Sequence, residues 1–141
     1  MSDVHSAWSE WFPTVAVNFH DFSISAGDSI TVTVIASSRT EGTAILTNNS
    51  KGKTVTKLVS SPQPLAPLCE QNAEWIVEDF GSDGELVSFV DFGEVIFTGA
   101  SARTASGFVS PSNATIIDIK QNNKTLTSAS TSDSSVTVTY I

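Results

Sequence analysis

Short runs of strand-forming residues recur along the whole 141-residue chain, and this recurrence constrains its fold more than any other feature. Turn signals separate the runs about every eight to twelve residues, a spacing typical of an antiparallel β-sandwich. No window repeats apolar residues with the helical period of i, i+3, i+4 and i+7. In residues 29–35, for example, Ile30, Val32 and Val34 share one face and hydroxyl residues take the other. The sequence therefore predicts an all-β fold, an antiparallel β-sandwich of two packed sheets.

The turns between the expected strands are marked by glycine, asparagine and proline. Residues 48–52, 81–84 and 121–123 predict tight turns, and three prolines predict an extended loop over 60–68. The strands expected between these turns cover residues 8–12, 15–24, 29–35, 42–47, 54–59, 69–80, 86–91, 94–99, 114–120 and 135–141.

The composition fits one folded domain over residues 1–141. Hydrophobic residues make up 40% of the chain and charged residues 16%, so the chain can bury one core. We expect Val32, Val34, Trp75 and Val77 in that core. The net charge of −8 disfavours nucleic acid and anionic membranes as partners, and no apolar run approaches the roughly 18 residues of a membrane span. An acidic protein is suited to work at low pH, where protonated carboxylates repel one another less.

Few residues of this chain could carry the common hydrolytic chemistries. Its two histidines are His5 and His20 and its one cysteine is Cys69, so we expect no metal site and no cofactor. No serine lies in a Gly-x-Ser-x-Gly sequence, and no glycine-rich loop precedes a helix. Carboxylates therefore remain as the candidates for chemistry.

A carboxylate pair could serve glycoside hydrolysis, and exposed tryptophans could then bind the sugar. The alternative is that most of these carboxylates are solvated residues at strand ends, since Asp and Glu are seldom buried. The tryptophans concerned are Trp8, Trp11 and Trp75. The carboxylates concerned are Glu10, Glu74, Glu78, Asp79, Asp91 and Glu94.

One acidic segment places a carboxylate among apolar neighbours. If residues 69–80 form a strand, Glu78 lies between Ile76 and Phe80 on one face. Apolar neighbours hold a carboxyl group closer to its neutral form, which suits proton exchange. The opposite face carries Ala73, Trp75, Val77 and Asp79.

Residues 72–80, NAEWIVEDF, closely resemble the glutamate-bearing strand of the glutamic peptidases, the eqolisin or scytalidoglutamic peptidase family. Residues 7–13, AWSEWFP, resemble that family's W-x-E-W-(Y/F)-P segment. Residues 22–30 resemble the strand and turn that follow the tryptophan block, and residues 136–141 resemble the last strand. The resemblance covers nearly the whole chain, in the family's order.

The resemblance implies a concanavalin-like β-sandwich and an endopeptidase that hydrolyses peptide bonds in proteins at acid pH. In this family a glutamate acts as general base on water, and a glutamine side chain donates a hydrogen bond to the developing oxyanion. The glutamate aligns with Glu78, while Trp8 and Glu10 align with residues that line the substrate groove. Ser6 stands where the family has an aspartate just before the tryptophan block, which departs from the pattern.

The family's catalytic glutamine, which lies upstream of the tryptophan block, aligns with no residue of this chain. Gln63 lies in the proline loop, Gln71 precedes a strand and Gln121 lies in a turn, so none is expected to replace it. In the family a cysteine at the place of Cys69 usually pairs with an upstream cysteine. We therefore expect the chain to be N-terminally incomplete, with a missing segment or a light chain as its partner. The alternative is a catalytically inactive β-sandwich that binds peptide or glycan.

We expect the full-length protein to be secreted. Ser, Thr, Asn and Gly dominate the polar positions and Lys is scarce, a composition common in secreted β proteins. Sequons begin at Asn48, Asn113 and Asn123, and no signal peptide is visible in this chain.

Overall fold

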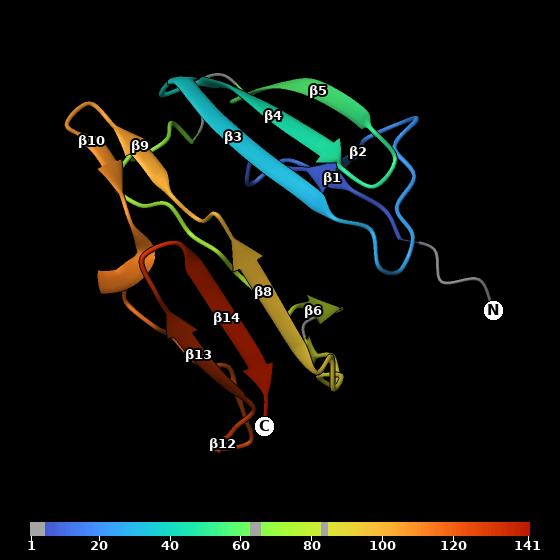
Figure 1. Cartoon of the computed structure of the whole chain (residues 1–141), viewed down its shortest axis with the longest axis vertical. Helices are drawn as coiled ribbons and strands as arrows, with labels where there is room; N and C mark the ends of the chain where they lie inside the picture. The colour runs from blue at the N-terminus through green and yellow to red at the C-terminus, as the bar shows by residue number, and fades with distance from the viewer. Residues whose placement is uncertain (1–4, 63–65, 83–84) are drawn as a thin grey trace. The chain divides into compact units, whose positions relative to one another are not determined.

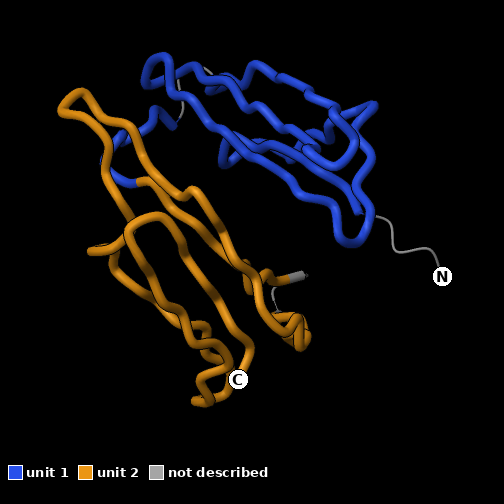
Figure 2. The backbone as a smooth tube through the Cα atoms, viewed as in Figure 1, with its two compact units in different colours: residues 1–72 blue, residues 73–141 orange. Residues whose placement is uncertain are grey.

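The computed structural model describes residues 5–62, 66–82 and 85–141, except for the side chains of Ser82 and Glu85. The chain divides into two compact units, Met1–Asn72 and Ala73–Ile141 (Figure 2). In the described part the regular structure is β, apart from a three-residue 3-10 helix, Pro111–Asn113, and all named strand pairs are antiparallel. The expected all-β class is therefore confirmed, while the single domain over 1–141 stays a prediction. No helix among these described residues is long and apolar enough to cross a membrane.

The first unit contains a three-stranded sheet in the order β3-β4-β5 (Figure 1). These strands are β3 (Ile30–Ser38), β4 (Glu41–Asn48) and β5 (Lys53–Ser60), and they confirm the strands expected at 29–35, 42–47 and 54–59. The β4–β5 turn is the expected one, since Asn48 pairs with Lys53 in register. Alternate residues of the central strand β4 are buried, so one of its two faces is covered: Gly42, Ala44, Leu46 and Asn48.

The expectation that Val32 and Val34 lie in the core is wrong. Their side chains are 61% and 73% exposed. Val32 is paired with Leu46 of β4 and Val34 with Ala44, and these two β4 residues are buried on the same side of the sheet. Because β3 is the end strand of this sheet among the described residues, burial falls on the central strand instead.

Of the strands expected at 8–12 and 15–24, the structure has a two-residue pairing of β1 (Trp8–Ser9) with β2 (Val17–Asn18). Ile24 also forms an isolated antiparallel bridge with His5. The chain turns between them, where Thr14 donates both its backbone N–H and its hydroxyl to the carbonyl of Trp11, at 2.8 and 2.6 Å. The Phe12–Pro13 peptide bond in this turn is cis.

Lys57 ties the β1–β2 ribbon to the sheet. Its Nζ donates to the carbonyls of Val17 and Asn18, each at 2.9 Å. The same ammonium lies 5.0 Å from the centre of the Phe19 ring, a distance at which cation–π attraction contributes. One lysine of β5 thus holds the end of the N-terminal ribbon against its own strand.

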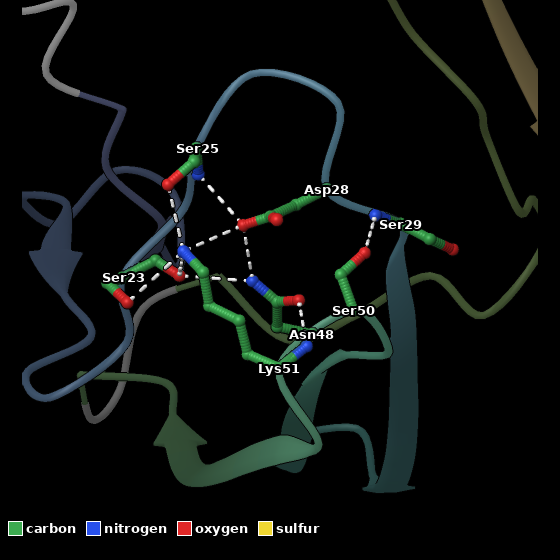
Figure 3. A network of polar contacts seen from close by, with 7 residues as sticks. All are labelled: Ser23, Ser25, Asp28, Ser29, Asn48, Ser50 and Lys51. Atoms are coloured by element: carbon green, nitrogen blue, oxygen red, sulfur yellow. Dashed lines mark hydrogen bonds and ion pairs between the residues drawn. The ribbon is translucent and has the colours of Figure 1, made fainter.

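A polar network joins the 23–29 turn to the β4–β5 turn (Figure 3). Asn48 is fully buried, and its Nδ2 donates to the Ser23 carbonyl at 3.1 Å and to Oδ2 of Asp28 at 2.7 Å. Its Oδ1 accepts the backbone N–H of Lys51 at 3.1 Å. The Lys51 ammonium lies 2.9 Å from the same Asp28 oxygen. Because Asn48 is buried and bonded, the first sequon cannot carry a glycan in the folded protein, whereas Asn113 and Asn123 are exposed.

The second unit is built on a sheet in the order β13-β14-β8 (Figure 1). Its strands are β8 (Glu94–Thr98), β13 (Thr127–Thr131) and β14 (Ser135–Tyr140), so the strands expected at 94–99 and 135–141 are confirmed. The second-unit core consists of Ala100, Val136 and Val138. Trp75 and Val77 pack against it partly buried, as expected, together with Phe92, Phe97 and Ala129.

Three short hairpins complete the second unit. β11 (Lys120–Gln121) and β12 (Lys124–Thr125) confirm the expected turn at 121–123, where Asn122 and Asn123 adopt left-handed φ angles of 49° and 61°. β6 (Gly81–Ser82) pairs with β7 (Glu85–Leu86). Asp83 and Gly84, where the sequence predicts a turn, lie outside the described residues, as does Pro64 of the expected proline loop. β9 (Ala102–Thr104) and β10 (Gly107–Val109) form a hairpin that the sequence did not predict.

Three expected strands are wrong as β-ladder elements. Residues 69–80 pair with no strand of the described part of the chain, and of 86–91 and 114–120 only the terminal residues Leu86 and Lys120 belong to one. These segments contain strand-forming residues, but a ladder also requires a neighbouring strand in register, which the local sequence does not specify.

Candidate active site

Residues 73–80 run in an alternating pattern even without a β-ladder. Trp75, Val77 and Asp79 are half-buried, while Ile76, Glu78 and Phe80 are exposed. Packing of Trp75 and Val77 on the second-unit core fixes which side faces inward. The expected division into two faces is therefore confirmed for residues 75–80, although Ala73 is exposed.

The Glu78 side chain lies on the outward side of this segment, between two large apolar side chains. Ile76 and Phe80 are 61% and 58% exposed. A carboxylate in this setting is open to water and substrate, and it stands beside apolar surface that a bound ligand could cover. The arrangement can support a general base that takes a proton from water.

Asp79, the next residue, points to the inward side and is bound there. Its Oδ1 accepts a hydrogen bond of 3.0 Å from Nε2 of Gln121, and the same nitrogen donates to the carbonyl of Val87 at 2.9 Å. The sequence placed Gln121 in a turn and gave no sign of this contact, because the two side chains are 42 residues apart along the chain. The side-chain amide of Gln121 therefore makes its hydrogen bonds on the inward side of the segment, away from Glu78.

Trp8 and Glu10 belong to the first unit and share one side of the tryptophan block. Burial alternates along residues 8–12. Ser9 is half-buried and Trp11 is buried, while Trp8, Glu10 and Phe12 are exposed. Trp8 is 50% exposed. The two residues expected to bind substrate are therefore presented on the same outward side.

Glu10 also borders an apolar cavity of about 350 Å³ within the first unit, whereas Trp8 does not line it. The cavity lies beside the loop that precedes residue 70, and exposed Cys69 is at its border. The remaining lining residues are Trp11, Phe12, Val34, Ile35, Ala36, Gly42, Val59, Ala66, Pro67 and Leu68.

The expectation of three exposed tryptophans holds only for Trp8. Trp11 is 8% exposed, and its Nε1 donates to the carbonyl of Ala66 at 2.8 Å. Trp75 is half-buried on the second-unit core. Trp11 therefore anchors the loop that borders the cavity, a structural role that the sequence did not reveal.

Several of the carboxylates considered for glycoside hydrolysis take part in local hydrogen bonds. Oδ1 of Asp91 accepts the backbone N–H of Gly93 at 2.9 Å, and Glu94 accepts from the hydroxyl of Thr139 at 3.4 Å. Asp79 is bound by Gln121. Within the described residues, no group of three or more His, Cys, Asp or Glu side chains could hold a metal ion.

Of the three glutamines weighed from the sequence, two are described. Gln71 is exposed and Gln121 is bound to Asp79 and Val87, while Gln63 lies outside the described residues. Cys69 is an exposed free thiol and not a buried core residue.

Residues 2–140 match the model of the Peptidase A4 family. The chain belongs to the Peptidase A4 family. Aspergillopepsin-2 of Aspergillus niger is 50% identical over 137 residues, which cover 97% of this chain and 48% of the relative. Scytalidopepsin B of Scytalidium lignicola is 38% identical over 144 residues, covering 97% and 55%. The chain thus spans about half the length of these relatives.

Solved structures of Peptidase A4 relatives share the fold. The crystal structure of aspergilloglutamic peptidase from Aspergillus niger matches with a TM-score of 0.88 and 50% identity, covering 96% of this chain and 79% of that chain. Scytalido-glutamic peptidase with a peptide-based transition-state analogue matches with a TM-score of 0.85 and 38% identity, covering 96% and 69%. The resemblance to glutamic peptidases and the β-sandwich class are therefore confirmed for this Peptidase A4 chain, while the roles of Glu78, Trp8 and Glu10 stay predictions.

Proposed function

We propose that this chain forms part of a glutamic endopeptidase that hydrolyses peptide bonds in proteins at acid pH, with Glu78 as its general base. The observation that carries the proposal is the outward position of Glu78, on a segment whose other side is packed on the second-unit core. Its carboxylate takes a proton from the attacking water and returns it to the leaving amine. Membership of a family of peptidases supports the reaction class.

We propose that the oxyanion donor is a glutamine from outside these 141 residues, in an N-terminal segment or a light chain. The family's glutamine aligns with no residue here, and the chain spans about half the length of its curated relatives. Gln121 is a poor substitute, because its amide already donates to two acceptors. Such a donor is worth roughly 3–4 kcal/mol, or about 10²–10³-fold in rate.

Protein or peptide is the proposed substrate, with Trp8 and Glu10 contacting it. Support comes from their shared exposure on the tryptophan block and from the apolar cavity that Glu10 borders. A relative has been solved with the tripeptide Ala-Ile-His, at 36% identity and a TM-score of 0.77, covering 89% of this chain and 67% of that chain.

Work in acid and secretion of the full-length protein are part of the same proposal. The net charge of −8 supports work in acid, because self-repulsion falls as carboxylates are protonated. The dominance of Ser, Thr, Asn and Gly among the polar residues, with few Lys, supports secretion. Detection of the full-length product in culture medium, and not in cells, would test the location.

The base is tested in a chain extended to the full length of its relatives. Glu78→Gln should lower peptide hydrolysis by about 10²–10⁴-fold without changing the circular dichroism spectrum. Glu74→Gln is the matched control: Glu74 lies four residues earlier, about 13 Å along an extended chain, and cannot share a water with Glu78. Equal losses in the two variants, or near-normal turnover by Glu78→Gln, would remove Glu78 from the mechanism.

The need for an outside glutamine is tested by a protein digest at about pH 2–4, near and below the pKa values of carboxyl groups in model peptides. The 141-residue chain is compared with the extended chain on protein and polysaccharide substrates. Cleavage of protein by the extended chain only is expected. Peptide binding without cleavage by both chains would instead favour an inactive binding β-sandwich, and robust cleavage by the short chain would refute the outside donor.

A further inference from the structure

Glu78 lies on a segment that has no β-ladder to hold it in register. Residues 73–80 pair with no strand among the residues that the structure describes, and the packing of Trp75 and Val77 fixes only the part before Glu78. The orientation of a catalytic group must nevertheless be fixed, because displacement by about 1 Å can cost 10²-fold in rate. Some other contact must therefore fix the chain beyond Val77.

The contact that fixes it is made by Gln121. Its Nε2 lies 3.0 Å from Oδ1 of Asp79 and 2.9 Å from the carbonyl oxygen of Val87. A glutamine amide has two N–H donors, so each acceptor can receive one hydrogen. Because Asp79 follows Glu78 directly and points to the opposite side, holding Asp79 inward directs Glu78 outward.

The two acceptors flank the β6–β7 hairpin. Asp79 lies just before β6 and Val87 just after β7, and Val87 N–H donates to the carbonyl of Phe80 at 3.4 Å. Gln121 therefore joins both arms at the base of this hairpin. It holds the two chain segments together where backbone pairing is sparse.

Gln121 is itself well anchored. It belongs to β11, in register with Lys124 of β12. The residues that follow this hairpin are buried: Leu126 is 8% exposed and Thr127 is 2% exposed. Leu126 N–H donates to the carbonyl of Ile119 at 2.9 Å, and the hydroxyl of Thr127 accepts the N–H of Ile119 at 2.8 Å. The amide thus projects from a fixed support.

We propose that Gln121 is a positioning residue that acts through Asp79 to orient the Glu78 carboxylate. This inference rests on the proposed role of Glu78 as general base. Loss of the Gln121 contact lets the Glu78 segment move, so that the base is correctly aligned for a smaller fraction of the time. The turnover rate then falls, while substrate affinity, which depends on other groups, is retained.

The first test measures motion in the chain extended to the length of its relatives and needs no activity. In Gln121→Ala, backbone amide NMR order parameters at Glu78 and Asp79 should fall from the rigid value of about 0.85 towards about 0.6. Gln71→Ala is the matched control, since Gln71 is exposed and its side chain has no hydrogen bond to the described residues. Unchanged order parameters in Gln121→Ala would overturn the proposal.

The second test measures kinetics in the chain extended to the length of its relatives. Gln121→Ala should lower kcat by about 10-fold or more with KM within about twofold, and Gln71→Ala should change neither. Asp79→Asn keeps an amide oxygen that can accept from Gln121 and should retain most of the activity. Asp79→Ala should resemble Gln121→Ala, and the double variant should be no worse than either single one.

These results separate the inference from the proposed function. If Glu78→Gln stays active, the base is wrong whatever Gln121 does. If Glu78→Gln is inactive while Gln121→Ala and Asp79→Ala turn over normally, only the positioning role is wrong. If Gln121→Ala fails to fold, Asp79→Ala breaks the same hydrogen bond and gives the same comparison with Asp79→Asn.

Discussion

Oδ2 of Asp28 accepts a hydrogen bond of 2.7 Å from Nδ2 of Asn48, a side chain that is fully buried. The same oxygen also receives the Lys51 ammonium at 2.9 Å and the backbone N–H of Ser25 at 2.9 Å (Figure 3). These donors, first Lys51 and then Asn48 and Ser25, lower the pKa of Asp28 from 3.8 to about 2. The carboxylate therefore stays ionised in all but the most acid part of the proposed working range.

The first prediction concerns the stability of the chain in acid. A carboxyl pKa that is lower in the folded state stabilises the fold above the unfolded value of 3.8, and this contribution is lost as the pH falls through about 2. Asp28→Asn should therefore lower Tm by a constant amount above about pH 4–5, and the difference should shrink between about pH 4 and 2. Thermal melts in steps of pH measure it.

The control for this titration is Asp21→Asn. Asp21 is exposed and has a left-handed φ of 58°, which asparagine accepts readily. Its Tm difference should be small at every pH. A Tm difference for Asp28→Asn that grows as the pH falls would contradict the assigned network.

The second prediction concerns Asn48 itself. Asn48→Ala removes three hydrogen bonds at a buried site and leaves the Ser23 carbonyl and the Lys51 N–H without this partner. It should lower the free energy of unfolding by about 1–3 kcal/mol. Asn49→Ala, one residue later, removes an exposed side chain and should cost less than about 1 kcal/mol. Urea denaturation of both variants measures the difference, and similar losses would argue against the buried network.

The parts of the fold that were predicted correctly are those specified by neighbouring residues. The β3–β4–β5 sheet was predictable because β-branched alternation is joined by short connections that set the register within about 30 residues. Val32 and Val34 were nevertheless placed in the core, since alternation shows that residues share a face and not whether another layer covers it. The strand expected at residues 69–80 was wrong for a related reason, because pairing in a β-ladder depends on a neighbouring strand elsewhere in the chain.

For the site, the sequence identified the face of Glu78 but not what fixes it. Period two alone separates Glu78 from Trp75 and Val77, and the structure has the same division. The Gln121–Asp79 hydrogen bond joins residues 42 apart, and a glutamine in a turn resembles any solvated side chain. Trp8 and Trp11 are both tryptophans, so the sequence does not distinguish their roles. Only the hydrogen bond from Trp11 to Ala66 shows that Trp11 has the structural role.

The third prediction separates these two tryptophans. Trp11→Phe loses the 2.8 Å hydrogen bond to Ala66 and should lower the free energy of unfolding by about 0.5–1.5 kcal/mol. Trp8→Phe should stay within about 0.5 kcal/mol of the parent chain, because Trp8 is half exposed. In the extended chain, Trp8→Phe should instead raise KM for peptide substrates. A stability loss in Trp8→Phe larger than in Trp11→Phe would reverse the assignment.

The last prediction concerns the outer edge of β3. Among the described residues β3 pairs only with β4, and eight of its nine residues are exposed. It carries no charge and no proline, whereas β5 at the other end carries Lys53 and Lys57. An uncharged, long edge strand invites pairing with another chain. We therefore expect the 141-residue chain alone to self-associate or to be marginally stable.

Val34→Lys tests whether β3 is the pairing edge. If the β3 strands of two copies pair antiparallel with Val34 opposite Val34, the two substituted lysines lie side by side on one face of the joined sheet and repel each other. This repulsion should weaken association by roughly 1 kcal/mol, which is several-fold in Kd. Leu58→Lys on β5 is the control, because Leu58 is 83% exposed but its strand already carries lysines. Light scattering across a concentration series measures both. A parent chain that stays monomeric and melts cooperatively above about 60 °C would contradict the prediction, and equal effects of the two lysines would mean that general apolar exposure drives the association.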